Sequence, residues 1–260
     1  MSAPAYLVAQ HVTVRLAGRA VVQNVTFSLP RRSLTALVGP NGAGKTSLLR
    51  AIAGLIPAEG TIGIGDTSVA TLSISERARR FAYLPQGHTV HWPLPVRDIV
   101  ALGRYPHGVT DPARLPAHDT DIVERAMRAA DVIGLADRRV TELSGGERSR
   151  VVLARVLAVE APVILADEPI ASLDPRYQLE VMGVLHRAAE AGALVIVVTH
   201  DLGLAARFAD NVLVLQDGRL AAAGTPSEAF SPEALADVFR VQAFRAEEGG
   251  KAVIVPWSAT

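Results

Sequence analysis

The chain has 260 residues, no cysteine, and equal numbers of basic and acidic side chains, 26 Lys plus Arg against 26 Asp plus Glu. The balanced charge gives no basic excess for nucleic acid or an anionic membrane surface, and the missing cysteines exclude disulfides and thiolate chemistry. No apolar run reaches the roughly 18 residues of a membrane span, and no basic segment precedes an apolar stretch near the start, so we expect neither a membrane helix nor a secretory signal.

Strand patterns dominate the first part of the chain. Apolar and polar residues alternate over residues 12–16 and 25–29, which predicts two strands. A short apolar strand over residues 33–38 leads into a glycine-rich turn, and a helix with one apolar face follows over residues 45–55. Another short strand is predicted over residues 81–84.

The segment 87–142 has a different character, because Pro, His and charged residues surround two helical patterns. Three-to-four spacing of apolar residues predicts helices over residues 96–104 and 121–133, joined by a loop over residues 106–116. We interpret this segment as a helical insertion into an α/β core formed by residues 1–86 and 143–260.

Strands and helices alternate again after the insertion. The predicted elements are a helix over 146–158, a strand over 163–166, a helix from Pro175, strands over 194–199 and 211–216, a turn at 217–218, and helix starts at Thr225 and Ser231. Alternation of this kind predicts an α/β fold with a largely parallel sheet.

A phosphate-binding loop is predicted between the strand over 33–38 and the following helix. The pattern G-x-x-x-x-G-K-[ST] is matched by Gly39, Pro40, Asn41, Gly42, Ala43, Gly44, Lys45 and Thr46, and Ser47 follows it. Glycines let backbone N–H groups turn toward phosphate oxygens, Lys45 supplies a charge to the β- and γ-phosphates, and the Thr46 hydroxyl reaches Mg²⁺. A glycine-rich turn before an ordinary helix is the alternative, and the strand–turn–helix context favours the phosphate loop.

Two carboxylates, Asp167 and Glu168, end the apolar strand that begins at Val163. Because α/β sheets bind ligands at the carboxyl ends of their strands, we expect Asp167 to hold Mg²⁺ and Glu168 to polarise the attacking water. The alternative, a solvated strand end, is the weaker interpretation beside a phosphate loop.

A second anion-binding helix start is predicted at residues 143–147, where Ser144, Gly145 and Gly146 precede Glu147. The alternative is an N-cap serine followed by flexible glycines. One nucleotide does not need two such helix starts, and a second copy of the chain would explain them.

These motifs together resemble the ATPase subunits of ATP-binding cassette (ABC) transporters over nearly the whole chain. Residues 143–147 match the family's signature motif, Gln86 its Q-loop glutamine, and His200 its switch histidine. Residues 172–174, which end in Asp174, match its D-loop. The order and spacing of the six motifs also match.

The resemblance implies a phosphate-loop ATPase core with a mostly parallel sheet, an antiparallel β subdomain and a helical insertion, all within one ABC domain over 1–260. ATP and Mg²⁺ are the implied cofactors. In a head-to-tail homodimer each ATP would lie between the phosphate loop of one copy and the signature motif of the other. The implied roles are catalysis by Glu168, His200 and Gln86, metal binding by Thr46, Gln86 and Asp167, and contacts in trans by Ser144, Gly145, Gly146 and Asp174.

One family feature is missing, because Leu16 occupies the place where an aromatic residue stacks on adenine. The sequence of residues 91–107 is similar to that of ATPase subunits from importers of iron–siderophore complexes, haem and cobalamin. An ordinary helix start would also explain this sequence. The resemblance implies permease subunits, a substrate-binding protein, and a peripheral position on the cytoplasmic face of the inner membrane. Another transported cargo, an exporter subunit and a non-transport ABC protein are the alternatives.

The predicted helix over 96–104 suggests where a membrane subunit would dock. Its apolar face, formed by Val96, Ile99 and Val100, is expected to lie near the groove that receives a coupling helix of the permease. A helix that faces the core would show the same pattern.

Overall fold

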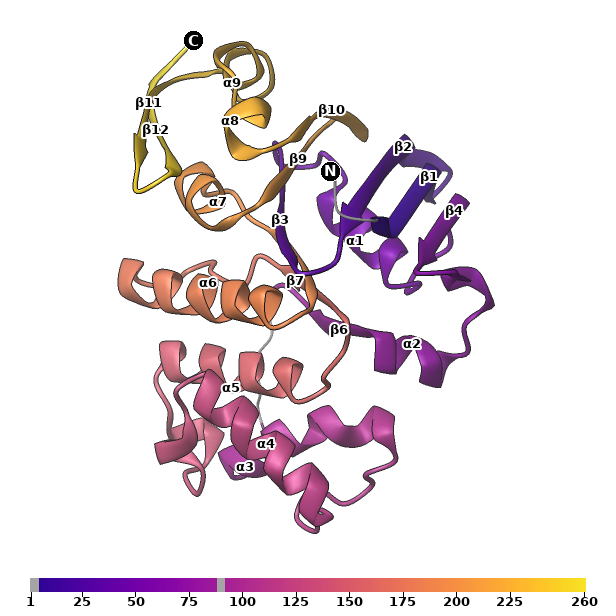
Figure 1. Cartoon of the computed structure of the whole chain (residues 1–260), viewed down its shortest axis with the longest axis vertical. Coiled ribbons are helices and arrows are strands. Elements are labelled where there is room, and N and C mark those ends of the chain that lie inside the picture. Colours follow the sequence, from indigo (N-terminus) through magenta and orange to yellow (C-terminus); the bar gives the residue numbers. More distant parts are fainter. Residues whose placement is uncertain (1–4, 88–91) are drawn as a thin grey trace.

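The computed structural model describes residues 5–87 and 92–260, and its centre is a six-stranded sheet (Figure 1). Five of the strands run parallel and β10 pairs antiparallel with β9 at one edge. In spatial order the strands are β10 (Arg219–Gly224), β9 (Asn211–Gln216), β3 (Ser33–Val38), β8 (Leu194–Val198), β7 (Val163–Asp167) and β6 (Phe81–Leu84).

Both faces of this sheet are buried, which explains why its strands read as continuous apolar runs. Successive residues of β7 point to opposite faces, so Val163 and Leu165 join one hydrophobic cluster while Ile164 and Ala166 join the other. Helix α1 (Lys45–Ile52) packs in the first cluster, and α6 (Pro175–Glu190) and α7 (Leu202–Phe208) pack in the second.

A separate antiparallel sheet of four strands packs over α1, in the order β2-β1-β4-β5. Its strands are β1 (Ala5–Leu16), β2 (Arg19–Pro30), β4 (Glu59–Ile64) and β5 (Thr67–Ser68), and α2 (Ile74–Arg80) follows. The β1–β2 hairpin turns at Ala17 and Gly18, both with positive φ, 47° and 79°. This sheet is the predicted antiparallel β subdomain, although β4, β5 and α2 were not predicted as elements.

The helical insertion has a hydrophobic cluster of its own. It is formed by α3 (Val96–Ala101), a 3-10 helix (Leu102–His107), α4 (Ala117–Ala129) and α5 (Gly145–Leu157). Helix α5 belongs to two clusters, since Val151 and Ala154 face the insertion while Val152 and Leu153 face the parallel sheet. The insertion therefore shares α5 with the core, and its bounds at residues 87–142 stay a proposal.

The apolar face of α3 is part of the core of the insertion, which was the alternative for this helix, and its position near a permease groove stays a prediction. Val96, Ile99 and Val100 are all 0% exposed, because α4 and α5 cover them. Apolar spacing marks a face for burial, but here the other helices of the insertion bury it.

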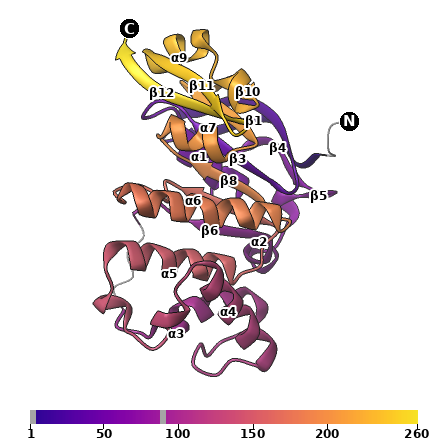
Figure 2. The ribbon, with the colours of Figure 1, turned by 60° about the vertical axis from the view of Figure 1, so that its left-hand side comes forward.

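The C-terminal part adds α8 (Pro226–Ala229), α9 (Pro232–Phe239) and a hairpin of β11 (Val241–Glu248) and β12 (Lys251–Ala259). The hairpin packs through β12 on α7, where Ile254 is 2% exposed. It was not predicted. Figure 2 shows it at the opposite end of the molecule from α3 and α4. Across residues 5–87 and 92–260, no helix has the length and apolarity that crossing a membrane demands.

Candidate active site

The glycine-rich loop between β3 and α1 adopts backbone conformations that side chains disfavour. Gly39, Gly42 and Gly44 have φ values of 148°, 78° and 96°. A Cβ atom on Gly44 would lie 2.3 Å from the carbonyl oxygen of Val21, so the loop packs against β2 too closely for any other residue. The loop wraps around the N-terminus of α1, the geometry that binds phosphate through backbone N–H groups.

The Lys45 side chain is held inside this loop and is only 6% exposed. Its Nζ donates hydrogen bonds to the carbonyl oxygens of Gly39 and Pro40 at 2.8 and 2.9 Å. Burial lowers the pKa of Lys45, while the carboxylates of Glu168 and Asp167 act in the opposite direction. A partly desolvated ammonium group interacts more strongly with phosphate than a solvated one.

Asp167 ends β7 and is 0% exposed. Its Oδ1 accepts a hydrogen bond from Thr46 Oγ1 at 3.1 Å, and its Oδ2 accepts one from Tyr83 Oη at 3.2 Å. Burial raises the pKa of this carboxyl group, and the two hydrogen bonds oppose the shift. Arg50 Nε in turn donates to Tyr83 Oη at 3.5 Å. The Thr46 hydroxyl and the Asp167 carboxylate are adjacent oxygen ligands of the type that Mg²⁺ prefers.

Glu168 lies beside Asp167 and has a positive φ of 51°. Its Oε2 accepts a hydrogen bond from Gln86 Nε2 at 2.7 Å, and its Oε1 lies 2.8 Å from His200 Nε2. The three residues follow the carboxyl ends of β7, β6 and β8, which are neighbours in the sheet. A small cavity of about 140 Å³ is lined by Glu168, Ser172 and His200, among others. The structure thus brings the three predicted catalytic residues together.

The residues predicted to act in trans make no hydrogen bond to the Glu168, Gln86 and His200 side chains within the described part of the chain. Ser144 caps α5, and its backbone N–H donates to Glu147 Oε2 at 2.7 Å, so the signature segment forms a capping box. Asp174 occupies the corresponding place at α6, where its exposed side chain makes no capping bond. Within residues 5–87 and 92–260, neither side chain hydrogen-bonds to the phosphate loop.

The starts of α5 and α6 contact each other through an aromatic ring and a salt bridge. A Cβ on Gly146 would lie 3.0 Å from the Tyr177 ring, so that ring packs directly on the signature segment. Arg150 Nη1 contacts Glu180 Oε2 at 2.7 Å, and its guanidinium lies 5.5 Å from the Tyr177 ring centre. Sequence patterns revealed neither Tyr177 nor Tyr83, because an isolated tyrosine carries no motif signal.

Leu16 is 46% exposed and lies at the end of β1, beside the β1–β2 turn. The neighbouring Arg15 is paired with Glu59, with Nε and Oε1 3.0 Å apart. The exposed leucine offers apolar surface without an aromatic face.

Similarity to known proteins identifies the family to which the chain belongs. The model of the family described as "ABC transporter" matches residues 22–171, which include the phosphate loop, Gln86, the signature segment and both carboxylates. The chain belongs to the ABC transporter family. This confirms the predicted family, the ATPase activity and the binding of ATP. The fold class is also confirmed, since the parallel core carries an antiparallel sheet and a helical insertion.

Relatives within the family cover most of the chain. It is 44% identical over 246 residues to a hemin import ATP-binding protein of Streptomyces coelicolor, which spans 94% of this chain and 87% of that protein. It is 43% identical over 231 residues to a cobalamin import ATP-binding protein of Halobacterium salinarum, spanning 87% of this chain and 56% of that protein. The fold also matches an inward-facing metal-chelate type ABC transporter with a TM-score of 0.82 at 25% identity, covering 98% of each chain.

Proposed function

We propose that this ATPase energises an importer of haem or a closely related iron complex. The observation that supports the proposal is the 44% identity to a hemin import ATP-binding protein over nearly the full length of both chains. Residues 92–107 support it as well, since they continue the segment that is similar to iron-complex and cobalamin importers. His91 starts that segment and lies outside the described residues.

In the proposed reaction Glu168 acts as general base. Its carboxylate orients a water molecule for attack on the γ-phosphate, and Gln86 and His200 hold the carboxylate through the contacts at 2.7 and 2.8 Å. Lys45 and the loop N–H groups bind the phosphate oxygens. Thr46 and Asp167, with Gln86, would hold a Mg²⁺ ion that neutralises phosphate charge.

A homodimer would complete the site. Ser144 and Gly145 are exposed at the start of α5, with Gly146 buried behind them, and the exposed Asp174 side chain, which makes no capping bond, lies at the start of α6. A second copy facing the phosphate loop would bring these groups to the γ-phosphate. Because the nucleotide would bridge the two copies, ATP binding and dimerisation would be thermodynamically linked.

The permease would dock in an apolar groove between the end of α1, α2 and β6. This groove has a volume of about 410 Å³, and its lining includes Leu55, Ile74 and Tyr83. Leu55 and Ile74 are 58% and 81% exposed and line the same groove, and exposed apolar side chains that lie together mark interaction sites. Tyr83 also donates to Asp167 at 3.2 Å, so it links the groove to the proposed metal ligand. In this arrangement the chain is peripheral on the cytoplasmic face of the membrane, and a substrate-binding protein delivers cargo on the other side.

The test is uptake by cells that lack this chain, supplied separately with hemin, a ferric siderophore or cobalamin. We expect loss of hemin uptake, restored by the wild-type chain and not by Glu168→Gln. Unchanged hemin uptake together with lost cobalamin uptake would contradict the proposal and would identify cobalamin as the cargo.

A further inference from the structure

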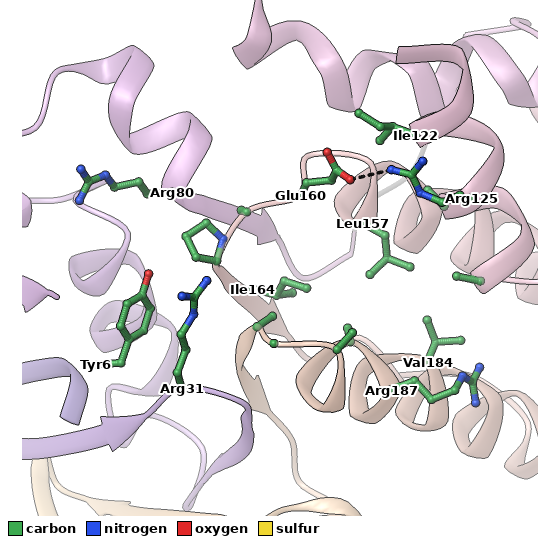
Figure 3. Close-up of a pocket in the computed structure, with 18 residues that line it drawn as sticks. Tyr6, Arg31, Arg80, Ile122, Arg125, Leu157, Glu160, Ile164, Val184 and Arg187 are labelled. Atoms are coloured by element: carbon green, nitrogen blue, oxygen red, sulfur yellow. Dashed lines mark hydrogen bonds and ion pairs between the residues drawn. The ribbon is translucent and has the colours of Figure 1, made fainter. Parts of the chain in front are cut away.

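A large cavity lies at the end of the sheet opposite to the nucleotide loop. It has a volume of about 850 Å³ and opens between α4, α6, and the β1–β2 sheet (Figure 3). Pro162 and Ala193, which directly precede β7 and β8, form part of its wall. Glu168 and His200 follow the other ends of these strands, so roughly 15 Å of strand separates the two sites. We call this cavity the basic cleft.

The charge of the basic cleft is strongly unbalanced, although the whole chain is neutral. Its lining includes four arginines and a single acidic residue, Glu160. Glu160 is already shared by two cations, since its Oε1 lies 3.0 Å from Arg125 Nη2 and its Oε2 lies 3.4 Å from the buried Arg104 Nη1. Its negative charge is therefore compensated without the other cleft arginines.

Three cleft arginines form no salt bridge with the described residues. No carboxylate oxygen lies within 4.0 Å of Arg31, Arg80 or Arg187 in residues 5–87 and 92–260. Arg31 instead lies over the Tyr6 ring, 4.9 Å from its centre. The pairing of a guanidinium with an aromatic face restrains the side chain and leaves its N–H donors available.

The floor of the cleft is apolar. In Figure 3, Ile164 and Leu157 lie between the Arg31–Tyr6 side and the Arg125 side, and Val184 lies below them near Arg187. Pockets of 300–1,000 Å³ that combine an apolar lining with a few convergent polar groups are typical of small-molecule sites. A purely ionic ligand would leave this floor unused, and a neutral apolar ligand would leave the arginines unpaired.

We propose that the basic cleft is a binding site for an amphipathic organic anion, a molecule with an apolar body and a carboxylate, sulfonate or phosphate group. The apolar body lies on Leu157, Ile164 and Val184, and the anionic group pairs with Arg31 or Arg187. The cleft joins α4 of the insertion to α6 and the start of β1 in the core, so a bound anion contacts both parts of the molecule. This site is independent of the proposed function.

The experiment uses two fluorescent probes that differ in one charged group. 8-Anilinonaphthalene-1-sulfonate carries the anionic group, and N-phenyl-1-naphthylamine has the same ring system without it. Both are titrated against the full chain with saturating MgADP, which occupies the phosphate loop. We expect one sulfonate probe to bind per chain.

Charge removal separates the two probes. Arg31→Gln and Arg187→Gln should each weaken sulfonate binding by about two- to fivefold, the range of a partly exposed ion pair, and should leave the neutral probe unchanged. Arg128→Gln is the matched control, because this α4 arginine pairs with Glu124 and does not line the cleft. Equal sulfonate affinity for the two cleft variants and the control would overturn the proposal.

A steric variant locates the binding. Ala129 is an exposed residue of α4 that lines the cleft, so Ala129→Trp fills the space without crowding a core. It should weaken the binding of both probes by at least tenfold while the melting temperature stays unchanged. Undiminished binding of both probes to this variant would place them elsewhere and would also overturn the proposal.

Discussion

At the residue scale, Glu168 is the side chain on which we propose that hydrolysis depends. Glu168→Gln keeps the size of the side chain but removes the basic carboxylate, so turnover should fall by roughly 10²-fold or more. ATP binding should survive, because the phosphate loop is untouched, and the variant should accumulate as an ATP-bound dimer. Turnover at saturating ATP and ATP affinity are the measurements. Lys45→Ala is the contrasting control, since it should weaken binding itself. Turnover close to wild type in Glu168→Gln would refute the role.

The buried carboxyl of Asp167 has a predictable effect on stability. Its pKa is raised by burial, so the folded chain holds this proton at pH values where the unfolded chain has lost it. As the pH rises above the ordinary pKa of an aspartic acid, this carboxyl group therefore lowers the free energy of unfolding. At a pH below that pKa it has no such effect. Asp167→Asn, which is neutral throughout, should melt above wild type at pH 7.

Melting curves recorded in chelator without nucleotide check this prediction. Each kcal/mol relieved should raise Tm by roughly 2–4 °C for a chain of this size, and the difference should shrink toward pH 4. Asp174→Asn is the matched control, because that carboxylate is exposed and should leave Tm unchanged. A difference that does not depend on pH would show that charge burial is not its cause.

Leu16 sets the expected base selectivity. An aromatic ring adds about 0.5–1.5 kcal/mol of stacking beyond buried area, so Leu16→Tyr should tighten ATP binding by up to roughly tenfold. Tripolyphosphate has no base, and its affinity should stay the same. Titrations of ATP, GTP and tripolyphosphate against both chains provide the test. Unchanged ATP affinity would mean that residue 16 does not contact the base.

At the element scale, α2 carries a large exposed apolar side chain, whereas the apolar face of α3 is buried. Ile99 of α3 is 0% exposed, so Ile99→Asp buries a charge and should destabilise the fold by roughly 3 kcal/mol or more, with loss of ATPase and transport together. Ile74 of α2 is 81% exposed in the proposed permease groove. Ile74→Asp should leave Tm and the ATPase activity of the isolated chain intact and lower transport. Normal transport by the Ile74→Asp variant would show that the permease does not dock in this groove.

At the scale of the whole molecule, the dimer predicts how two inactive variants complement each other. Ser144→Arg blocks the signature motif and Lys45→Ala disables the phosphate loop. In a head-to-tail dimer, a mixed pair has one composite site with both groups intact and another that is doubly damaged. An equal mixture should therefore recover roughly a quarter of wild-type turnover by random pairing, whereas each variant alone stays inactive. No recovery in the mixture would support sites built within single chains.

The class of fold and the proposed chemistry were both predictable from local sequence patterns. The phosphate loop, Asp167 and Glu168 could be recognised because each motif is a short run whose spacing fixes its local geometry: a turn before a helix, or acids at a strand end. The same holds for β3, β6 and β9, whose predicted bounds match the structure because both of their faces are buried.

The tertiary structure alone decided which distant residues meet. Glu168 contacts Gln86 and His200, 82 and 32 residues away, because β6, β7 and β8 are adjacent in the sheet, and strand order leaves no local trace. An apolar helix face predicts that the face is buried, but not which element covers it. The sequence pattern of α3 therefore could not distinguish burial in the core from burial against a partner. The basic cleft likewise gathers side chains from Tyr6 to Ala193, and only the packing of the insertion against the core brings them together.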